Sequence, residues 1–397
     1  MTRPAFELAQ IIREYRNSFI ANCNPLKHHQ RVLNAIEKCR TAALGGHIDQ
    51  CTDCNHIRIS YNSCRNRHCP KCQAVNRERW ILQREKDLLP TSYFHVVFTL
   101  PQELNSFCLK HPVELYNMLF TSCKETLFVF GNDQKHLGAQ MGFIALLHTW
   151  GQNLSLHPHL HCIVPGGGFT SDDKWKNARS NGSFLFPVKA MSIVFKNKFM
   201  QKLKMFFIEK KMHLEPQLRK TLYNKNWVVY AKQPFLGPEQ VIEYLGRYSH
   251  KIAISNHRIK SIDGGKVSFS YKDYADANKT KIMSLTANEF LRRFCMHILP
   301  PKFMKIRHYG FLANRSKYKL RTHQQNMGLT KQKSNEKAEK SPWKEIAKEK
   351  LNFDVEKCPC CKTGKMITIF CFDANAPPAT LNFINQLMKR QNKIPLA

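Results

Sequence analysis

Apolar residues recur every three or four positions between Phe6 and Ala42, with polar residues between them. This spacing matches the 3.6-residue turn of an amphipathic helix. The Asn24-Pro25 pair interrupts the pattern, because the residue before a proline is disfavoured in helical geometry. The pattern therefore predicts two helices here, and residues 75–89 return to the same period and predict a third.

β-branched and aromatic residues gather in short runs further along the chain. The run Tyr93–Leu100, closed by Pro101, predicts a buried strand. Residues 141–149 and 157–164 predict two more strands, joined by a polar turn at residues 151–155. Because alternate strand residues point to opposite faces, the third run presents histidines on one face and apolar residues on the other.

The remainder of the chain mixes helical and extended patterns. Helices are predicted for residues 103–130, 238–248 and 287–298. Residues 252–254 are expected to pair with residues 266–271 in a hairpin that turns at Asp263-Gly264-Gly265. Residues 323–350 are rich in Lys, Gln, Asn and Glu, which predicts a linker. Together these elements predict an α+β protein in which helices pack on an antiparallel sheet.

The charge narrows the choice of partner. The chain has 62 Lys and Arg residues against 29 Asp and Glu residues, a net charge of +33, and 43% of its residues are hydrophobic. Such a surface favours a polyanion, and nucleic acid is the expected partner. No apolar run has the length of a membrane span, which argues against a membrane protein. The first fifteen residues are charged from Arg3 onward and unlike a secretory signal, so a cytoplasmic protein is expected.

Fifteen cysteines in a chain expected in the cytoplasm indicate metal binding rather than disulfides. Two Cys-x-x-Cys pairs stand fourteen residues apart and predict one structural Zn²⁺ site with four thiolates. These predicted ligands are Cys51, Cys54, Cys69 and Cys72. Cys64, His47, His56 and His68 lie close by, and one of them could replace a cysteine or help to form a second site. Local packing and turn polarity are the favoured interpretation of these four residues.

A further Cys-x-x-Cys pair stands near the end of the chain. In the run Cys358-Pro359-Cys360-Cys361 a second pair is missing, and Cys371 stands alone. A Zn²⁺ ion shared with distant ligands is one reading of this tail, and free thiols are the other.

The histidine strand is the strongest chemical signal. His159 and His161 share one strand face and can bind one divalent cation, such as Mg²⁺ or Mn²⁺. The amide of Gln152, on the preceding turn, is the expected third ligand, with His157 as the alternative. About ninety residues later, Tyr244 and Tyr248 are spaced to share one helix face. Simple packing of the two rings is the competing interpretation.

Several runs of the sequence carry a family resemblance. A strand ending in FTL, the His-hydrophobic-His strand and a tyrosine-bearing helix follow one another as in the HUH endonuclease superfamily. The runs WGQNLSLHPHLHCIVPGGG, YLGRYSHKIAISNHRI, YKDYADANKTK and IRHYGFLANR resemble rolling-circle transposases of the insertion-sequence-ninety-one type. The segment SCRNRHCPKCQ resembles the zinc module of that family, and the resemblance covers most of the chain.

The resemblance implies a HUH endonuclease domain preceded by a helical and zinc-binding module. It makes His159 and His161 metal ligands and Tyr244 and Tyr248 the nucleophile pair, with Gln152 as third ligand. The implied activity is DNA transposition: single-stranded DNA and transposon-end DNA are nicked and rejoined through a 5′-phosphotyrosine. A HUH replication initiator or relaxase, and a zinc-dependent DNA-binding protein without catalysis, are the rivals.

The expected domains follow from these patterns and the resemblance. They are N-terminal helices at 1–45, a zinc module at 46–76, the catalytic domain at 77–275, a helical extension at 276–322, a basic linker at 323–350 and a Cys-containing tail at 351–397.

Overall fold

A computed structural model describes residues 4–179, 183–235, 240–241, 244, 246, 251–274, 276–329, 343–374, 382 and 386. Most of the predicted helix 238–248, including Tyr248, lies outside these residues, whereas Tyr244 is described and helical. Two helices open the chain and stop on either side of Asn24-Pro25, as predicted: α1 (Leu8–Cys23) and α2 (Lys27–Glu37).

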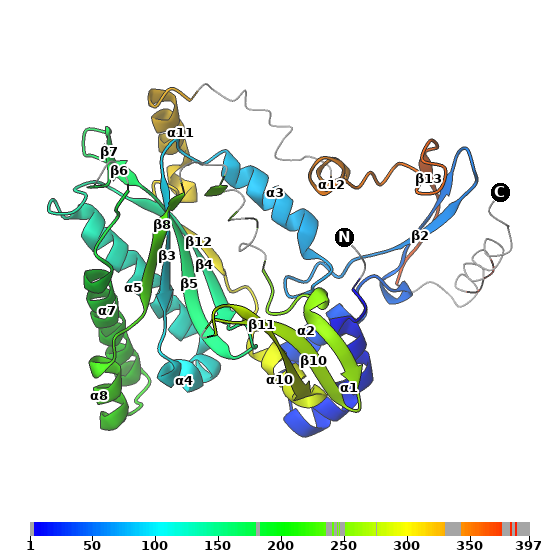
Figure 1. Cartoon of the computed structure of the whole chain (residues 1–397), viewed down its shortest axis with the longest axis horizontal. Helices are drawn as coiled ribbons and strands as arrows, with labels where there is room; N and C mark the ends of the chain where they lie inside the picture. The colour runs from blue at the N-terminus through cyan, green and yellow to red at the C-terminus, as the bar shows by residue number, and fades with distance from the viewer. Residues whose placement is uncertain are drawn as a thin grey trace.

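A five-stranded sheet forms the centre of the molecule, with strand order β12-β4-β5-β3-β8 and every neighbouring pair antiparallel (Figure 1). Its strands are β3 (Tyr93–Thr99), β4 (Gly142–Trp150), β5 (Leu156–Pro165), β8 (Val229–Phe235) and β12 (Ile306–Gly310). The three strands predicted in this region are confirmed.

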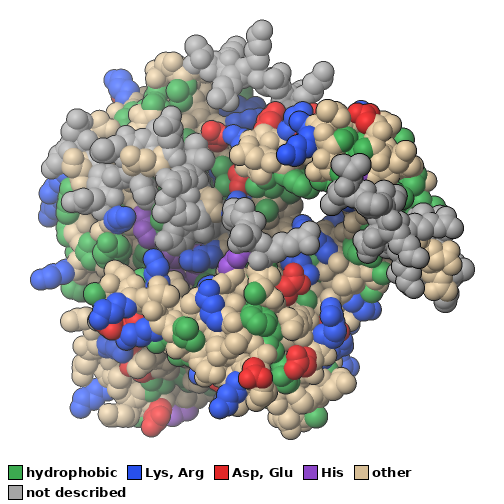
Figure 2. Space-filling model, turned by 45° about the vertical axis from the view of Figure 1, so that its right-hand side comes forward, with side chains coloured by type: hydrophobic (Ala, Val, Ile, Leu, Met, Phe, Trp, Pro, Cys, Tyr) green, Lys and Arg blue, Asp and Glu red, His purple; other side chains and the backbone are tan. Residues whose placement is uncertain are grey.

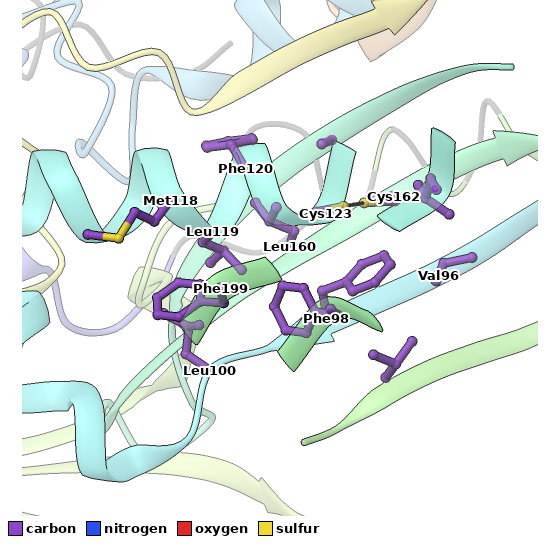
Figure 3. Close-up of a cluster of buried hydrophobic side chains, with 14 of the residues drawn as sticks. Val96, Phe98, Leu100, Met118, Leu119, Phe120, Cys123, Leu160, Cys162 and Phe199 are labelled. Carbon is purple, nitrogen blue, oxygen red and sulfur yellow. Dashed lines mark hydrogen bonds between the residues drawn. The ribbon is translucent and has the colours of Figure 1, made fainter. Parts of the chain in front are cut away.

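Helices cover one face of this sheet. The long helices α5 (Pro112–Asn132) and α7 (Val188–Glu209) lie along it, with α4 (Asn105–Lys110) and α8 (Pro216–Asn224) at their ends. Figure 3 shows Leu119 of α5 facing Phe98 and Leu160 of the strands, with Phe120 on another side of the helix. All four are fully buried. The alternation of the strands thus directs one set of their side chains into this core and the other set, which includes the apolar Ile144, Leu146 and Ile163, to the opposite face.

A second core joins the start of the chain to its middle. Helix α1 packs on α10 (Ala287–Met296), which itself packs on a three-stranded sheet of β9 (Ile259–Asp263), β10 (Lys266–Asp273) and β11 (Lys279–Thr286). The predicted turn at Asp263-Gly264-Gly265 is confirmed. The predicted first strand is wrong, because β10 pairs with residues 259–263 rather than with 252–254. In the observed register Asp263 pairs with Lys266, so the two glycines alone form a two-residue hairpin turn.

The zinc module continues into a third sheet with the order β13-β1-β2. Strands β1 (Gly46–Cys51) and β2 (Ile57–Tyr61) form a hairpin, and β13 (Met366–Phe372), from the end of the chain, pairs antiparallel with β1. Figure 1 shows these strands beyond the N-terminal end of α3 (Gln73–Glu85), away from the central sheet.

Smaller elements complete the described fold. They are the 3-10 turns at Ala42–Leu44, Gln102–Leu104, Asn256–Arg258 and Asn314–Ser316, the short pair β6 (Gly167–Phe169) and β7 (Trp175–Asn177), and helices α11 (Lys317–Asn326) and α12 (Trp343–Leu351). Helices α11 and α12 occupy the two ends of the segment for which the sequence predicted a linker. The α+β prediction, with helices on an antiparallel sheet and an N-terminal zinc-binding region, is confirmed.

Candidate functional site

Four histidines lie on the face of the central sheet opposite to α5 and α7. His159 and His161 are alternate residues of β5, so they share this face as predicted. The strand register adds two more: His148 of β4 lies directly across from His159, and His95 of β3 lies across from Ile163. His95, His148 and His161 are buried, and His159 is half-buried.

Three of these histidines can hold one metal ion. Ligand atoms of His148, His159 and His161 all lie within 4.8 Å of one another, and Nε2 of His159 is 3.1 Å from Nε2 of His161. The Nδ1 atom of His159 is 2.6 Å from the carbonyl oxygen of His157. A carbonyl in that place orients an imidazole so that its Nε2 atom is available for metal.

Gln152, which the sequence predicted as the third ligand, is not part of this cluster. Its side-chain Nε2 donates to the hydroxyl of Tyr274 over 3.0 Å at an exposed position. The alternative, His157, has an exposed side chain. His148 takes the third position instead, because strand pairing places it beside His159 whereas Gln152 lies in the turn beyond the ladder. That pairing depends on an irregularity in the ladder. The register shifts between His148 and Trp150, whereas a regular hairpin closed at residues 151–155 would place His148 opposite Pro158.

Tyr244 joins the cluster from the side of β3. Its side chain is buried among Leu88, Leu89 and Val241. Its hydroxyl oxygen lies 2.5 Å from Nε2 of His95 and 3.1 Å from Nδ1 of His161.

The ring of His161 therefore stands between two groups. The nitrogen that faces Tyr244 is Nδ1, and the nitrogen that faces His159 is Nε2. The sequence did not point to His95 as a site residue. The available signal was its position in a predicted strand, on the same face as Val97 and Thr99.

The site is desolvated, and the lysines Lys232 and Lys251 add positive charge near it. Burial lowers the pKa of His159 to about 4 and that of His95 to about 4, in the second case with a contribution from Lys232. Burial and the neighbouring His148, His159 and His95 lower the pKa of His161 well below its usual range. Burial and Arg258 also lower the pKa of Lys251. The imidazoles of His95, His159 and His161 are thus neutral near pH 7 and have lone pairs for a metal ion or for hydrogen bonds.

The predicted zinc ligands fall into two separate clusters. Cys69 and Cys72 meet Cys39 and Cys64, with Sγ of Cys72 lying 3.3 Å from Sγ of Cys39 and 3.6 Å from Sγ of Cys64. Four thiols at this spacing fit one tetrahedral Zn²⁺ ion, whose thiolate sulfurs stand a little under 4 Å apart at a Zn–S length of about 2.3 Å.

Cys51 and Cys54 lie instead with Cys358 and Cys361. The single site predicted from the two Cys-x-x-Cys pairs is therefore wrong. Cys51 and Cys54 lie at the end of β1 and in the turn that follows it, whereas Cys69 and Cys72 lie in the loop before α3. Cys51 and Cys54 find their partners about 300 positions further along the sequence, whereas Cys69 and Cys72 find theirs upstream at Cys39 and Cys64.

Comparison with known proteins places this geometry in a family. Residues 142–319 match the family model described as "Putative transposase", and residues 11–100 match "Transposase zinc-binding domain". The chain is 43% identical over 392 residues to "Putative transposase y4qJ" of Sinorhizobium fredii, a match that covers 95% of this chain and 98% of that protein. The chain belongs to the IS91 family of transposases.

A second relative is more distant. The transposase is 28% identical over 291 residues to "Transposase for insertion sequence element IS801" of Pseudomonas savastanoi pv. phaseolicola, over 70% of this chain and 68% of that protein. No solved structure matches the transposase.

The zinc-binding domain of the transposase is clamped to the central sheet. The guanidinium of Arg67, next to the first cysteine cluster, donates to the carbonyl oxygens of Phe303 at 2.5 Å and Pro300 at 2.9 Å, just before β12. Backbone carbonyls bound by one planar fork fix both position and orientation. The cluster therefore braces the segment that leads into β12 of the central sheet.

The surface of the transposase is rich in cations, as its DNA substrate requires. Figure 2 shows histidine side chains near the middle of one face, with lysine and arginine side chains beside them. In the part of the chain that the structure describes, no helix is long and apolar enough to cross a membrane.

Proposed function

We propose that this transposase nicks and rejoins single-stranded DNA through a 5′-phosphotyrosine intermediate and so drives rolling-circle transposition. Tyr244 is the proposed nucleophile, with Tyr248 as its partner. The observation that carries the proposal is the position of Tyr244, whose hydroxyl contacts one nitrogen of His161 while the other nitrogen of the same ring belongs to the three-histidine cluster.

Hydrogen bonding in the site orients the nucleophile. If Nε2 of His161 coordinates a metal ion, its remaining proton resides on Nδ1 and can be donated to the Tyr244 oxygen. The Tyr244 hydroxyl can then donate its own proton to Nε2 of His95. The two donors and two acceptors are matched in this arrangement, and the tyrosine oxygen keeps a lone pair for attack.

The donor set also bears on the metal. Three imidazole nitrogens suit Mn²⁺ or Zn²⁺ better than Mg²⁺, which prefers oxygen ligands and retains water. Of the two expected cations, Mn²⁺ is therefore the better fit to His148, His159 and His161. When bound, such an ion supplies Lewis-acid stabilisation of a phosphate oxygen and leaves coordination positions open to the DNA.

The proposed reaction conserves the phosphodiester energy. The Tyr244 oxygen attacks the phosphorus atom, the bond from phosphorus to the 3′ oxygen breaks, and that oxygen takes a proton to become a free 3′-hydroxyl. The 5′ phosphate stays on the tyrosine. Attack by a 3′-hydroxyl on this link reverses the step and rejoins a strand without ATP. A second tyrosine, Tyr248, would let one end be held while another is cut.

Cations near the site favour an extended anionic strand as substrate. Lys251 and Arg258 follow Tyr248 by three and ten residues, and hydrogen bonds to the backbone carbonyls of Ser270 and Ala253 hold Arg258 in place. Together with the net charge of +33, these residues support binding of single-stranded and transposon-end DNA, in the cytoplasm where the host DNA lies.

Covalent capture tests the proposal. The full chain is incubated with Mn²⁺ and a diverse pool of single-stranded oligonucleotides and resolved on a denaturing gel, beside Tyr244→Phe, Tyr248→Phe and the double variant. Tyr230→Phe, which changes an exposed tyrosine of β8, is the matched control. We expect an adduct in the wild type and the control and none in the double variant.

Two results would contradict the proposal. An adduct that persists in the double variant would place the nucleophile elsewhere. Tight DNA binding without any adduct, in the wild type as in the variants, would favour a zinc-dependent DNA-binding protein whose tyrosines only pack.

A further inference from the structure

A second cluster of four cysteines brings the two ends of the chain together. Sγ of Cys51 lies 3.6 Å from Sγ of Cys361, and Sγ of Cys54 lies 3.7 Å from Sγ of Cys358. All four sulfur atoms lie within 4.8 Å of one another. We propose that these four residues form a second structural Zn²⁺ site, which fastens the C-terminal tail to the N-terminal module.

The backbone around the sulfur atoms is arranged as for thiolates. The amide of Asp53 donates to Cys51 Sγ over 3.4 Å, and the amide of Gly364 donates to Cys361 Sγ over 3.3 Å. The amide of Cys360 donates in the same way to Cys358 Sγ over 3.4 Å. Successive amides that point at sulfur stabilise negative charge and orient metal ligands. Free thiols packed as small hydrophobes do not require such donors.

Glycine at position 364 is a steric requirement of the site. A Cβ atom there would stand 2.4 Å from Sγ of Cys51 and 2.8 Å from Cγ of Asp53. Any other residue would push the C-terminal loop away from the N-terminal pair. The two loops are thus shaped for close approach across the whole length of the chain.

Strand pairing and side-chain hydrogen bonds next to the cluster hold its two loops in position. Strand β13 pairs with β1 from Gly46 to Cys51. Beside it the carboxylate of Asp49 accepts hydrogen bonds from Arg58 and Thr368. The match to the zinc-binding domain covers residues 11–100 and so includes only the N-terminal half of this cluster. Cys358 and Cys361 complete it from outside that domain.

A pair of disulfides does not describe this geometry. Disulfide sulfurs lie about 2.05 Å apart, whereas Cys51 and Cys361 stand 3.6 Å apart, Cys54 and Cys358 stand 3.7 Å apart, and all four cysteines are free thiols. Four mutually close sulfurs, two from each Cys-x-x-Cys loop, match the tetrahedral arrangement of structural zinc. The site ties down the tail that also holds α12, which packs on α3. Loss of the ion is therefore expected to free the tail and leave the first cluster and the central sheet in place.

Zinc counting with matched cysteine variants tests the proposal, and it does not depend on the transposition reaction. Zinc per chain is measured by elemental analysis of the full-length protein, and Cys358→Ser and Cys361→Ser are each expected to lose one zinc relative to wild type. Cys360→Ser and Cys371→Ser change exposed cysteines of the same tail and are expected to lose none. The test compares the zinc content of each variant with that of the wild type, because the histidine cluster can also bind zinc.

A second measurement covers the case in which a variant fails to fold. Wild-type protein is treated with a thiol-alkylating reagent with and without a zinc chelator, and the labelled cysteines are identified by mass spectrometry. We expect Cys360 and Cys371 to react at once, and Cys358 and Cys361 to react only after chelation. Equal zinc content in Cys358→Ser and wild type, labelling of Cys358 as fast as of Cys360, or recovery of a Cys54–Cys358 disulfide would each overturn the proposal.

Discussion

Replacing His148 and Gln152 by alanine, one at a time, tests which of the two residues is the third metal ligand. The structure favours His148, whereas the sequence predicted Gln152. His148 is 3% exposed and its ring belongs to the three-histidine cluster, whereas Gln152 makes one exposed hydrogen bond to Tyr274. We therefore expect His148→Ala to weaken metal binding strongly and Gln152→Ala to leave it almost unchanged.

The magnitude follows from the number of ligands. A structural Zn²⁺ ion with four ligands contributes roughly 10–16 kcal/mol, or about 2.5–4 kcal/mol per ligand. Mn²⁺ binds nitrogen ligands more weakly than Zn²⁺ does. Loss of one of three imidazoles should therefore cost about 2–3 kcal/mol, a rise of roughly 30- to 150-fold in the dissociation constant. An exposed hydrogen bond is worth no more than about 0.5 kcal/mol, or roughly twofold.

The assay is Mn²⁺ binding by calorimetry, followed by adduct formation as a function of Mn²⁺ concentration. His148→Ala should shift both curves by the same factor, while thermal unfolding shows that the protein is still folded. If Gln152→Ala shifts the curves and His148→Ala does not, the reasoning from strand register is refuted and Gln152 regains the third position.

Three further outcomes are expected from the structure. Arg67→Ala removes the guanidinium that binds the carbonyls before β12 and should lower the free energy of unfolding by about 2–4 kcal/mol in denaturant titrations. Arg31→Ala changes an exposed arginine and should alter the free energy of unfolding by less than about 0.5 kcal/mol. Equal losses in the two variants would contradict the role given to Arg67. Phe98→Ala empties a fully buried position against α7 and should cost about 3–5 kcal/mol, with Mn²⁺ binding lost only at temperatures where the fold is lost. Arg292 lowers the pKa of Glu289 to about 2, so this carboxylate stabilises the fold above pH 4.5 and the stabilisation disappears as the pH falls toward 2. Because the ion pair is partly exposed, the stabilisation is about 1 kcal/mol. Glu289→Gln should remove this pH dependence of the free energy of unfolding, and an unchanged pH profile in the variant would contradict the prediction.

Local pattern was sufficient for the parts of the fold that depend on neighbours along the chain. The helices on either side of Asn24-Pro25, the three predicted strands of the central sheet and the shared face of His159 and His161 all follow from a period of 3.6 or 2.0 residues. Strands β8 and β12 of the same sheet were not predicted. The same alternation foresaw that the opposite face of β5 would be apolar. Charge likewise pointed to a nucleic-acid partner without any knowledge of the fold.

The partners in each site were decided by tertiary structure. A strand's own pattern shows which face a residue takes, but the register with its neighbour determines what lies beside it. For that reason His148 and His95 enter the site, and Gln152 does not.

The cysteines make the same point over a longer range. Cys51-x-x-Cys54 and Cys69-x-x-Cys72 are the nearest such pairs in sequence, yet they belong to different clusters. Cys54 meets Cys358, which is 304 positions away. Spacing within a pair is set by the local backbone, and so the sequence alone identifies each knuckle. Which knuckles share an ion depends on the packing of β13 against β1, a contact that forms only when the whole chain has folded.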